Sequence, residues 1–189
     1  MTRDNFKIKR QYRLPDWDYS GQGYYFVTIC TKDRVDCFGE IKNDKMELSY
    51  IGRFIRQQWM NLSDDEYNIN IDEYVVMPNH LHGIIAINKK RKNLIGNSMN
   101  RISTTKIKNN PMLIEHVTLG GLIRQYKART KYWVNRLQND VDFSWQSKFY
   151  DRIIRDDNEL NEIRKYIRNN PLKFDLDRNN LPYEFDMLN

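Results

Sequence analysis

The sequence predicts an α+β fold, a ferredoxin-like antiparallel sheet with a β-α-β-β-α-β core and helices on one face. Short runs rich in Val, Ile, Tyr and Phe, typical of strands, alternate with segments whose apolar residues recur every three or four positions, typical of amphipathic helices. The expected order is strand, short hairpin, helix, strand, strand, long helix, strand, helix. With 189 residues and 40% hydrophobic composition, the chain can bury such a core as one domain.

The first half of the chain supplies the first three long strands and the first helix. A strand is expected over 24–31, followed by a short hairpin over 37–50. Apolar residues then recur at four-residue spacing and indicate a helix that ends near Asn61. A second hairpin follows, in which two β-branched runs flank a turn at 77–79.

The second half begins with a long helix, for which Thr118 is the expected N-cap. Its apolar face is predicted to consist of Leu119, Leu122, Ile123, Tyr126, Trp133 and Leu137. The final strand is expected over 145–155, and the acidic and amide residues at 156–158 offer caps for the last helix. Pro171 is expected to stop that helix.

His80 and His82 open the second strand of the 74–87 hairpin. Alternate residues of a strand point to the same face, so the two imidazoles are expected side by side, with Leu81 directed into the core. Such a pair can supply two nitrogen ligands to a divalent metal ion. The alternative is a pair of polar histidines that are hydrogen-bonded to neighbouring residues.

The charge of the chain favours a polyanionic partner. Its net charge is +6 and 13% of its residues are aromatic, a combination that suits single-stranded nucleic acid, although Tyr-rich strands can simply form a sheet. Arg124, Lys127 and Lys131 share one face of the long helix and could follow a phosphate backbone, or could be an ordinary solvated face.

A basic insertion is predicted over 88–112, where seven Lys or Arg residues occur with no Asp or Glu. Its densest part is the run Lys89, Lys90, Arg91 and Lys92. The insertion is expected to be either a solvated loop or a loop that orders on a nucleic-acid strand.

The remaining organisation follows from composition. Residues 1–20 are expected to form a basic arm, 21–171 the folded domain and 172–189 a polar tail. Cys30 and Cys37 match neither a zinc spacing nor a disulfide framework, so both are expected to be reduced packing residues. No segment is apolar enough for a signal peptide or a membrane span, which predicts a soluble, cytoplasmic protein.

Four ordered segments give the sequence a specific resemblance. Residues 25–31, 74–85 (YVVMPNHLHGII), 145–155 and 166–172 (YIRNNPL) are similar to the motifs of the single-strand tyrosine transposases of small insertion sequences. The resemblance is greatest to their REP-associated relatives, in the HUH endonuclease superfamily. It extends from about residue 10 to residue 175.

The resemblance implies roles for four residues. Tyr166 would be the catalytic tyrosine, His80 and His82 would bind the metal, and Asn170 would complete the metal site from the same helix as Tyr166. From spacing alone, Tyr166 and Asn170 share a helical face, and they could equally be a tyrosine at the edge of the core and an asparagine that closes the helix.

The implied reaction is cleavage and rejoining of single-stranded DNA near hairpins through a 5′-phosphotyrosine, with Mg²⁺ or Mn²⁺ recruited together with the DNA. Tyr126, Tyr132 and Tyr150 are competing candidates for the nucleophile. The alternative function is a non-catalytic single-stranded nucleic-acid-binding protein derived from a transposase. Monomer and homodimer both remain open.

Overall fold

The computed structural model describes residues 22–64, 68–88, 118–138 and 142–177. Its centre is a four-stranded antiparallel sheet in the order β4-β5-β1-β6. The strands are β1 (Gly23–Cys30), β4 (Ile69–Met77), β5 (His80–Ile87) and β6 (Tyr150–Ile154), and the helices are α1 (Tyr50–Met60), α2 (Leu119–Leu137) and α3 (Asp157–Asp177). The predicted arm and basic insertion, including Lys89, Lys90, Arg91 and Lys92, lie outside the described residues, as does the tail from 178 onward.

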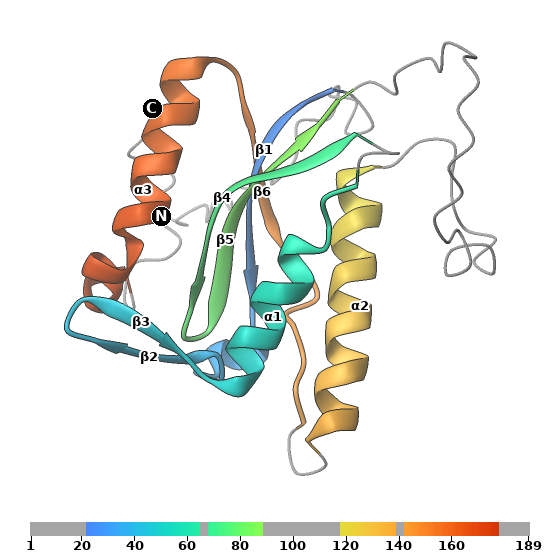
Figure 1. The fold of residues 1–189 in the computed structure, drawn as a ribbon, viewed down its shortest axis with the longest axis vertical. Coiled ribbons are helices and arrows are strands. Elements are labelled where there is room, and N and C mark those ends of the chain that lie inside the picture. Colours follow the sequence, from blue (N-terminus) through green and yellow to red (C-terminus); the bar gives the residue numbers. More distant parts are fainter. Residues whose placement is uncertain (1–21, 65–67, 89–117, 139–141, 178–189) are drawn as a thin grey trace, which may run out of the picture.

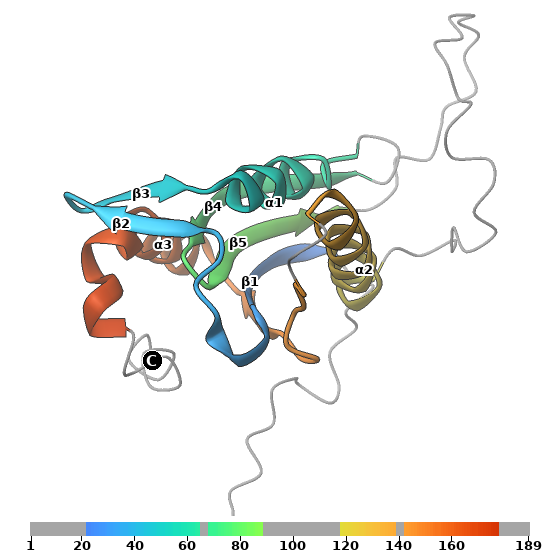
Figure 2. The same ribbon diagram turned by 90° about the horizontal axis from the view of Figure 1, so that it is seen from below.

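The ferredoxin-like prediction is confirmed, because the chain order β1-α1-β4-β5-α2-β6 combines with this strand order to give the expected core. Helices α1 and α2 cover one face of the sheet, where their apolar side chains pack with Leu81 and Ile85 of β5. The added helix α3 covers the opposite face, where it packs on Phe26 and Ile84 (Figures 1 and 2). The sheet is therefore the middle layer of three.

A small hairpin joins β1 to α1, as the sequence predicts. After a 3-10 turn at Lys32–Arg34, strands β2 (Gly39–Lys42) and β3 (Lys45–Leu48) pair around Asn43 and Asp44, whose φ values are +50° and +60°. Asn and Asp tolerate this left-handed conformation better than most residues, which explains their place in the turn. The side chain of Ser49 then accepts the N–H of Gly52 at 3.0 Å and caps α1.

Helix α2 begins at the predicted cap, where the hydroxyl of Thr118 accepts the N–H of Gly121 at 3.0 Å. The predicted apolar face is wrong in its second half, because Trp133 is 41% exposed and Leu137 is 52% exposed. The buried line runs through Thr130 and Val134 instead. A count of apolar residues misses Thr130. Its buried hydroxyl is satisfied because it donates a hydrogen bond to the carbonyl of Tyr126 at 2.7 Å.

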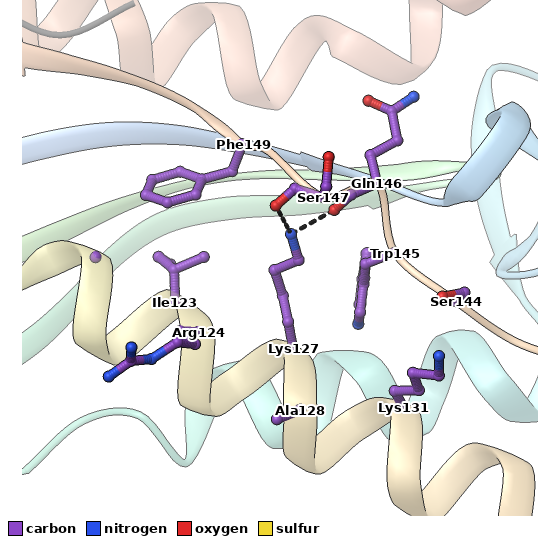
Figure 3. Close-up of a pocket in the computed structure, with 11 residues that line it drawn as sticks. Ile123, Arg124, Lys127, Ala128, Lys131, Ser144, Trp145, Gln146, Ser147 and Phe149 are labelled. Atoms are coloured by element: carbon purple, nitrogen blue, oxygen red, sulfur yellow. Dashed lines mark hydrogen bonds between the residues drawn. The ribbon is translucent and has the colours of Figure 1, made fainter.

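The segment that follows α2 differs from the predicted strand, since β6 begins only at Tyr150. Trp145 makes a single bridge with Thr31, and the carbonyl groups of the next three residues then turn toward Lys127 of α2. Its ammonium group donates to the carbonyl oxygens of Gln146 at 2.5 Å and Ser147 at 3.1 Å (Figure 3). It also donates to the carbonyl oxygen of Lys148 at 3.4 Å. A lysine from another element thus takes the carbonyls that a strand ladder would have used.

Helix α3 contains Pro171, where the sequence predicted an end. Proline removes one helical hydrogen bond and favours a kink, and Figure 2 shows the C-terminal turns of α3 leaving the direction of the rest of the helix. The turn before Pro171 is fixed by burial of Ile167 and Asn170, so packing overrides the local stop signal. The predicted cap is present, because Asp156 Oδ1 accepts the N–H of Glu159 at 2.9 Å.

Two further predictions can be compared with the structure. Cys30 and Cys37 are both free thiols, and burial raises the pKa of both, that of Cys37 to about 11, as suits packing residues. Among the helices that the structure describes, none combines the length and apolar character needed to cross a membrane.

Candidate active site

The two histidines lie where strand periodicity places them, on the α3 face of β5. Both His80 and His82 are completely buried, and their ring centroids are 4.6 Å apart. Leu81 between them points into the core under α1 and α2, as predicted. The two imidazoles therefore share one buried patch of the sheet.

The tautomer of His80 is set by two hydrogen bonds in series. The Nδ2 atom of Asn79 donates to Asp36 Oδ1 at 2.7 Å, which turns the amide oxygen of Asn79 toward His80. That oxygen lies 2.7 Å from His80 Nδ1 and can only accept, so Nδ1 carries the hydrogen. Nε2 of His80 therefore keeps a lone pair, the form in which histidine binds a metal.

His82 is held by β1 on one side. The hydroxyl of Thr28, its cross-strand partner, lies 2.8 Å from His82 Nδ1, and the ring of Phe26 stacks on the imidazole at 5.5 Å. Burial lowers the pKa of His82 to about 3, and the nearby charge of Arg34 adds to the shift. Burial also lowers the pKa of His80 well below its ordinary value, so both rings are neutral at pH 7.

The glycine after His82 has a steric reason. A Cβ atom built on Gly83 would lie 2.5 Å from Cζ2 of Trp59, because the indole of α1 packs directly on the backbone of β5. Trp59, which packs against β5 on the face opposite the histidines, thus leaves room only for glycine at position 83.

Helix α3 brings Tyr166 to this patch. Its apolar residues Leu160, Ile163 and Ile167 pack on the sheet, and that rotation directs the Tyr166 ring toward the histidines. The ring of Tyr166 lies edge-on to His82 at 5.5 Å and to Phe26 at 6.0 Å between centroids. Tyr166 is half-buried, so part of the residue stays exposed while the ring packs beside the histidines.

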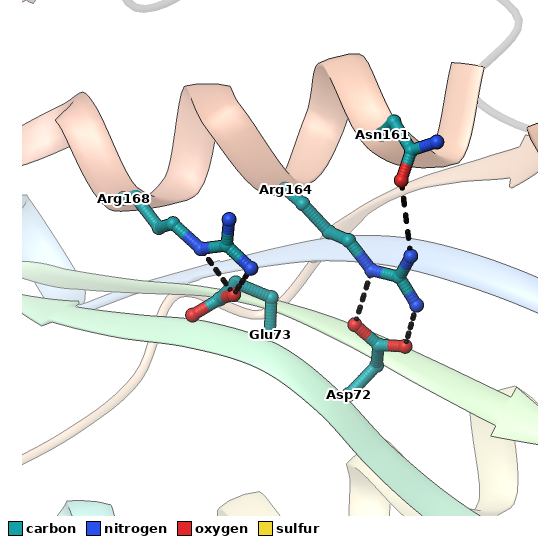
Figure 4. Close-up of polar contacts among 5 residues, drawn as sticks. All are labelled: Asp72, Glu73, Asn161, Arg164 and Arg168. Atoms are coloured by element: carbon teal, nitrogen blue, oxygen red, sulfur yellow. Dashed lines mark hydrogen bonds and ion pairs between the residues drawn. The ribbon is translucent and has the colours of Figure 1, made fainter. Parts of the chain in front are cut away.

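Two arginines on either side of Tyr166 fix the rotation of the helix. Arg164 makes a bidentate contact with Asp72, at 2.8 Å and 2.5 Å, and Arg168 contacts Glu73 at 2.6 Å (Figure 4). The hydrogen bond from Arg164 lowers the pKa of the Asp72 carboxyl. The more buried pair of Arg164 with Asp72 is expected to contribute about 1 kcal/mol to the free energy of unfolding, and the more exposed pair of Arg168 with Glu73 less.

Consecutive strand residues normally face opposite sides, yet Asp72 and Glu73 both reach α3 (Figure 4). A register shift between Ile71 and Tyr74 explains this, because three steps on β4 there oppose two steps on β5. This β-bulge adds one residue to β4 and directs two carboxylates to the same face.

Asn170 follows Tyr166 by one turn and is 1% exposed. Within the part of the chain that the structure describes, its two polar side-chain atoms and Nε2 of His82 are buried and have no hydrogen-bond partner. Each such atom costs about 1–3 kcal/mol if nothing binds it. A neutral imidazole nitrogen and an amide oxygen are both competent metal ligands, so His80, His82 and Asn170 could hold a divalent cation. The described residues contain no group of three or more His, Cys, Asp or Glu that could do so.

The competing tyrosines differ in their surroundings. Tyr126 is buried, its hydroxyl donates to the carbonyl of Ile55 at 3.1 Å, and burial raises its pKa well above the ordinary value, all of which disfavour it as a nucleophile. Tyr132 is 56% exposed on α2, on the other side of the sheet from the histidines. Tyr150 pairs in register with Thr28 and so lies on the histidine face, two strands from β5.

The predicted DNA-binding residues of α2 do not join the histidines. Arg124 and Lys131 are exposed on the helix that covers the other face, and Lys127 is engaged by carbonyl groups. Sequence reasoning missed Asn79, the partner of His80, and Asp36, the partner of Asn79. Asn79 is adjacent to His80 in the chain, which was a usable signal, whereas Asp36 is brought in only by the fold.

Comparison with known proteins finds both a similar sequence and a similar structure. An uncharacterized protein of Haemophilus influenzae is 35% identical over 170 residues, which cover 90% of this chain and 92% of that protein. The solved structure of a REP-associated tyrosine transposase bound to a REP hairpin matches with a TM-score of 0.52 and 16% identity, over 86% of this chain and 74% of that one. This second match shows a shared fold. No family model matches the chain.

Proposed function

We propose that this chain, which belongs to the same family as the Haemophilus influenzae protein, is a transposase-like enzyme that cuts and rejoins single-stranded DNA. The observation that carries the proposal is the Tyr166 ring, half-buried and 5.5 Å from the ring of a neutral, buried His82. The shared fold with a tyrosine transposase supports the same conclusion.

The reaction begins on Tyr166. Its hydroxyl oxygen attacks a phosphorus atom of the DNA strand, the bond from phosphorus to the 3′ oxygen breaks, and the tyrosine proton is lost while the 3′ oxygen gains one. The product is a 5′-phosphotyrosine and a free 3′-OH. Attack by a 3′-OH on the phosphotyrosine reverses these steps and rejoins a strand without an external energy source.

Two features of the structure prepare this attack, the anchoring of α3 and the group formed by His80, His82 and Asn170. The packing of α3 and its arginine pairs hold Tyr166 in place, which lowers the entropic cost of reaching the phosphate. His80, His82 and Asn170 are the proposed ligands of Mg²⁺ or Mn²⁺ and present neutral donors, so they leave the positive charge of the ion uncompensated. A divalent cation bound there would polarise the scissile phosphate.

The proposed substrate is single-stranded DNA next to a hairpin. The matched transposase structure contains a REP hairpin, and the +6 net charge of this chain suits a polyanion. Cleavage is therefore expected to require a single-stranded segment beside a hairpin, and a plain duplex of the same sequence should not be cut.

The experiment is covalent capture of labelled oligonucleotides that carry a hairpin and a single-stranded flank, with Mg²⁺ or Mn²⁺, on a denaturing gel. Wild type should give a shifted band that disappears in Tyr166→Phe, which keeps the ring contacts but lacks the attacking oxygen. Tyr150→Phe is the matched control, because it removes a hydroxyl from the same face, and it should leave the band intact. The double variant His80→Ala/His82→Ala should lose the band as well.

The result also separates the alternative function. Metal-independent binding of single strands that is unchanged by Tyr166→Phe, with no covalent band on any hairpin substrate, would identify a non-catalytic binding protein. A band that survives Tyr166→Phe but disappears in Tyr150→Phe would mean that the nucleophile is Tyr150.

A further inference from the structure

A second candidate site lies on the α2 side of the sheet, away from the histidines. A cavity of about 350 Å³ opens between α2 and the segment 144–149 that precedes β6 (Figure 3). Its walls include the apolar side chains of Ile123, Trp145 and Phe149. This volume is at the lower end of the range for small-molecule pockets and suits one planar group rather than a double helix.

Lys127 makes this cavity a fixed feature rather than a loose gap. Its ammonium group donates hydrogen bonds to the carbonyls of Gln146, Ser147 and Lys148, and these bonds hold the segment against α2. Trp145 is held by the same helix, because its indole N–H donates to the hydroxyl of Thr130 at 2.9 Å. The apolar walls are therefore positioned before any ligand arrives.

The rim of the cavity is cationic. Arg124 and Lys131 both line it and are exposed, and they are two turns apart on α2, roughly 10 Å along the helix axis. None of the described residues that line the cavity is acidic. A ligand with a flat apolar body and negative charge on both sides fits this combination, whereas a neutral metabolite would leave the rim charges without a partner.

We propose that this pocket binds one unstacked base of single-stranded DNA, with Arg124 and Lys131 contacting the phosphates on either side of it. The inference rests on the proposed function, because it names where a segment of the same substrate is held outside the reacting centre. Base contact with aromatic side chains is tolerant of sequence and contributes about 1–3 kcal/mol per base. The pocket thus gives the enzyme a grip on single strands that a duplex, with its bases stacked, does not offer.

The test measures binding without chemistry. A fluorescein-labelled oligothymidine of about ten nucleotides is titrated against Tyr166→Phe protein in EDTA and followed by fluorescence anisotropy. In that background, Ala128→Phe should fill the cavity, since Ala128 lines it and is exposed, and should weaken binding about 5-fold to 150-fold. The double variant Arg124→Gln/Lys131→Gln should weaken binding to a similar or greater extent.

The matched control is Arg129→Gln/Arg136→Gln, which removes the same charge from exposed positions of α2 outside the cavity. It should weaken binding clearly less. Equal losses in the two double variants would mean general electrostatic attraction and would overturn the proposal. So would unchanged binding by Ala128→Phe with an unchanged urea-unfolding midpoint.

A second measurement does not depend on any variant. Tyr166→Phe protein should bind an oligothymidine better than a strand of the same length with abasic sites, and equal affinity would overturn the base-binding proposal. Failure here is distinguishable from failure of the proposed function. Covalent capture that survives without pocket-dependent binding refutes only the pocket, and pocket-dependent binding without capture refutes only the chemistry.

Discussion

Acid should destabilise this protein through His82 in a way that can be calculated. The ordinary pKa of histidine is about 6.5, and burial lowers the pKa of His82 in the folded chain to about 3. Between these two values the unfolded state binds a proton at this position and the folded state does not. The contribution of His82 is therefore fully present above pH 6.5 and is lost as the pH falls toward 3.

The magnitude follows from the width of that interval. Each pH unit below 6.5 costs about 1.4 kcal/mol, so His82 should remove about 2 kcal/mol of unfolding free energy by pH 5. His80 acts in the same direction, since burial also lowers its pKa. Asp72 does not interfere at pH 5, because its carboxyl has a lowered pKa and the unfolded carboxyl is also ionised there.

The assay is urea unfolding at pH 7 and pH 5 in EDTA, followed by far-ultraviolet circular dichroism. The loss between the two pH values is compared in wild type and in His82→Gln, so the destabilisation caused by the substitution itself cancels. Wild type should lose about 2 kcal/mol more than the variant, and Tyr150→Phe should behave as wild type. Equal losses in wild type and His82→Gln would refute the reasoning, because His82 would then take up its proton in the folded state.

Two other substitutions test the support of the histidine pair. Gly83→Ala should lower the unfolding free energy by about 1–3 kcal/mol, because the new Cβ meets the indole of Trp59 at 2.5 Å; a urea midpoint equal to that of wild type would contradict this packing. Asn79→Ala should weaken Mn²⁺ binding about 10-fold to 100-fold, read from the free-ion signal in electron paramagnetic resonance, because His80 loses the bond that orients it. Asp36→Asn should weaken it less, and unchanged affinity in both variants would exclude an orienting role.

Much of the fold could be predicted from the sequence because local patterns and packing agree there. The period of two in β5 put His80 and His82 on one face, and the turn residues Asn43 and Asp44 located the small hairpin. The predictions failed where a long-range contact overrides a local rule. Thr130 takes a core position because its hydroxyl accepts the indole N–H of Trp145, and that pairing cannot be read from a helical pattern.

The site was predictable only in part. Spacing placed Tyr166 and Asn170 on one helical face but gave no reason for α3 to approach the histidines, and the resemblance supplied that expectation. The approach depends on which side of the sheet α3 covers, and so on long-range contacts such as that between Arg164 and Asp72, which lie 92 residues apart in the chain. The role of Asp36 was unpredictable for the same reason, since it reaches His80 only through Asn79.

The extra residue in β4 gives the orientation of Tyr166 an unusual origin. Without it, alternation would send one of Asp72 and Glu73 into the opposite layer, and α3 would keep a single ionic contact about which it could roll. Two contacts four residues apart on the helix define a line, and that line determines which way Tyr166 points. The direction of a side chain on α3 thus depends on the length of β4. Deleting one residue between Ile71 and Tyr74 should turn Tyr166 away from the histidines although the sequence of α3 is unchanged.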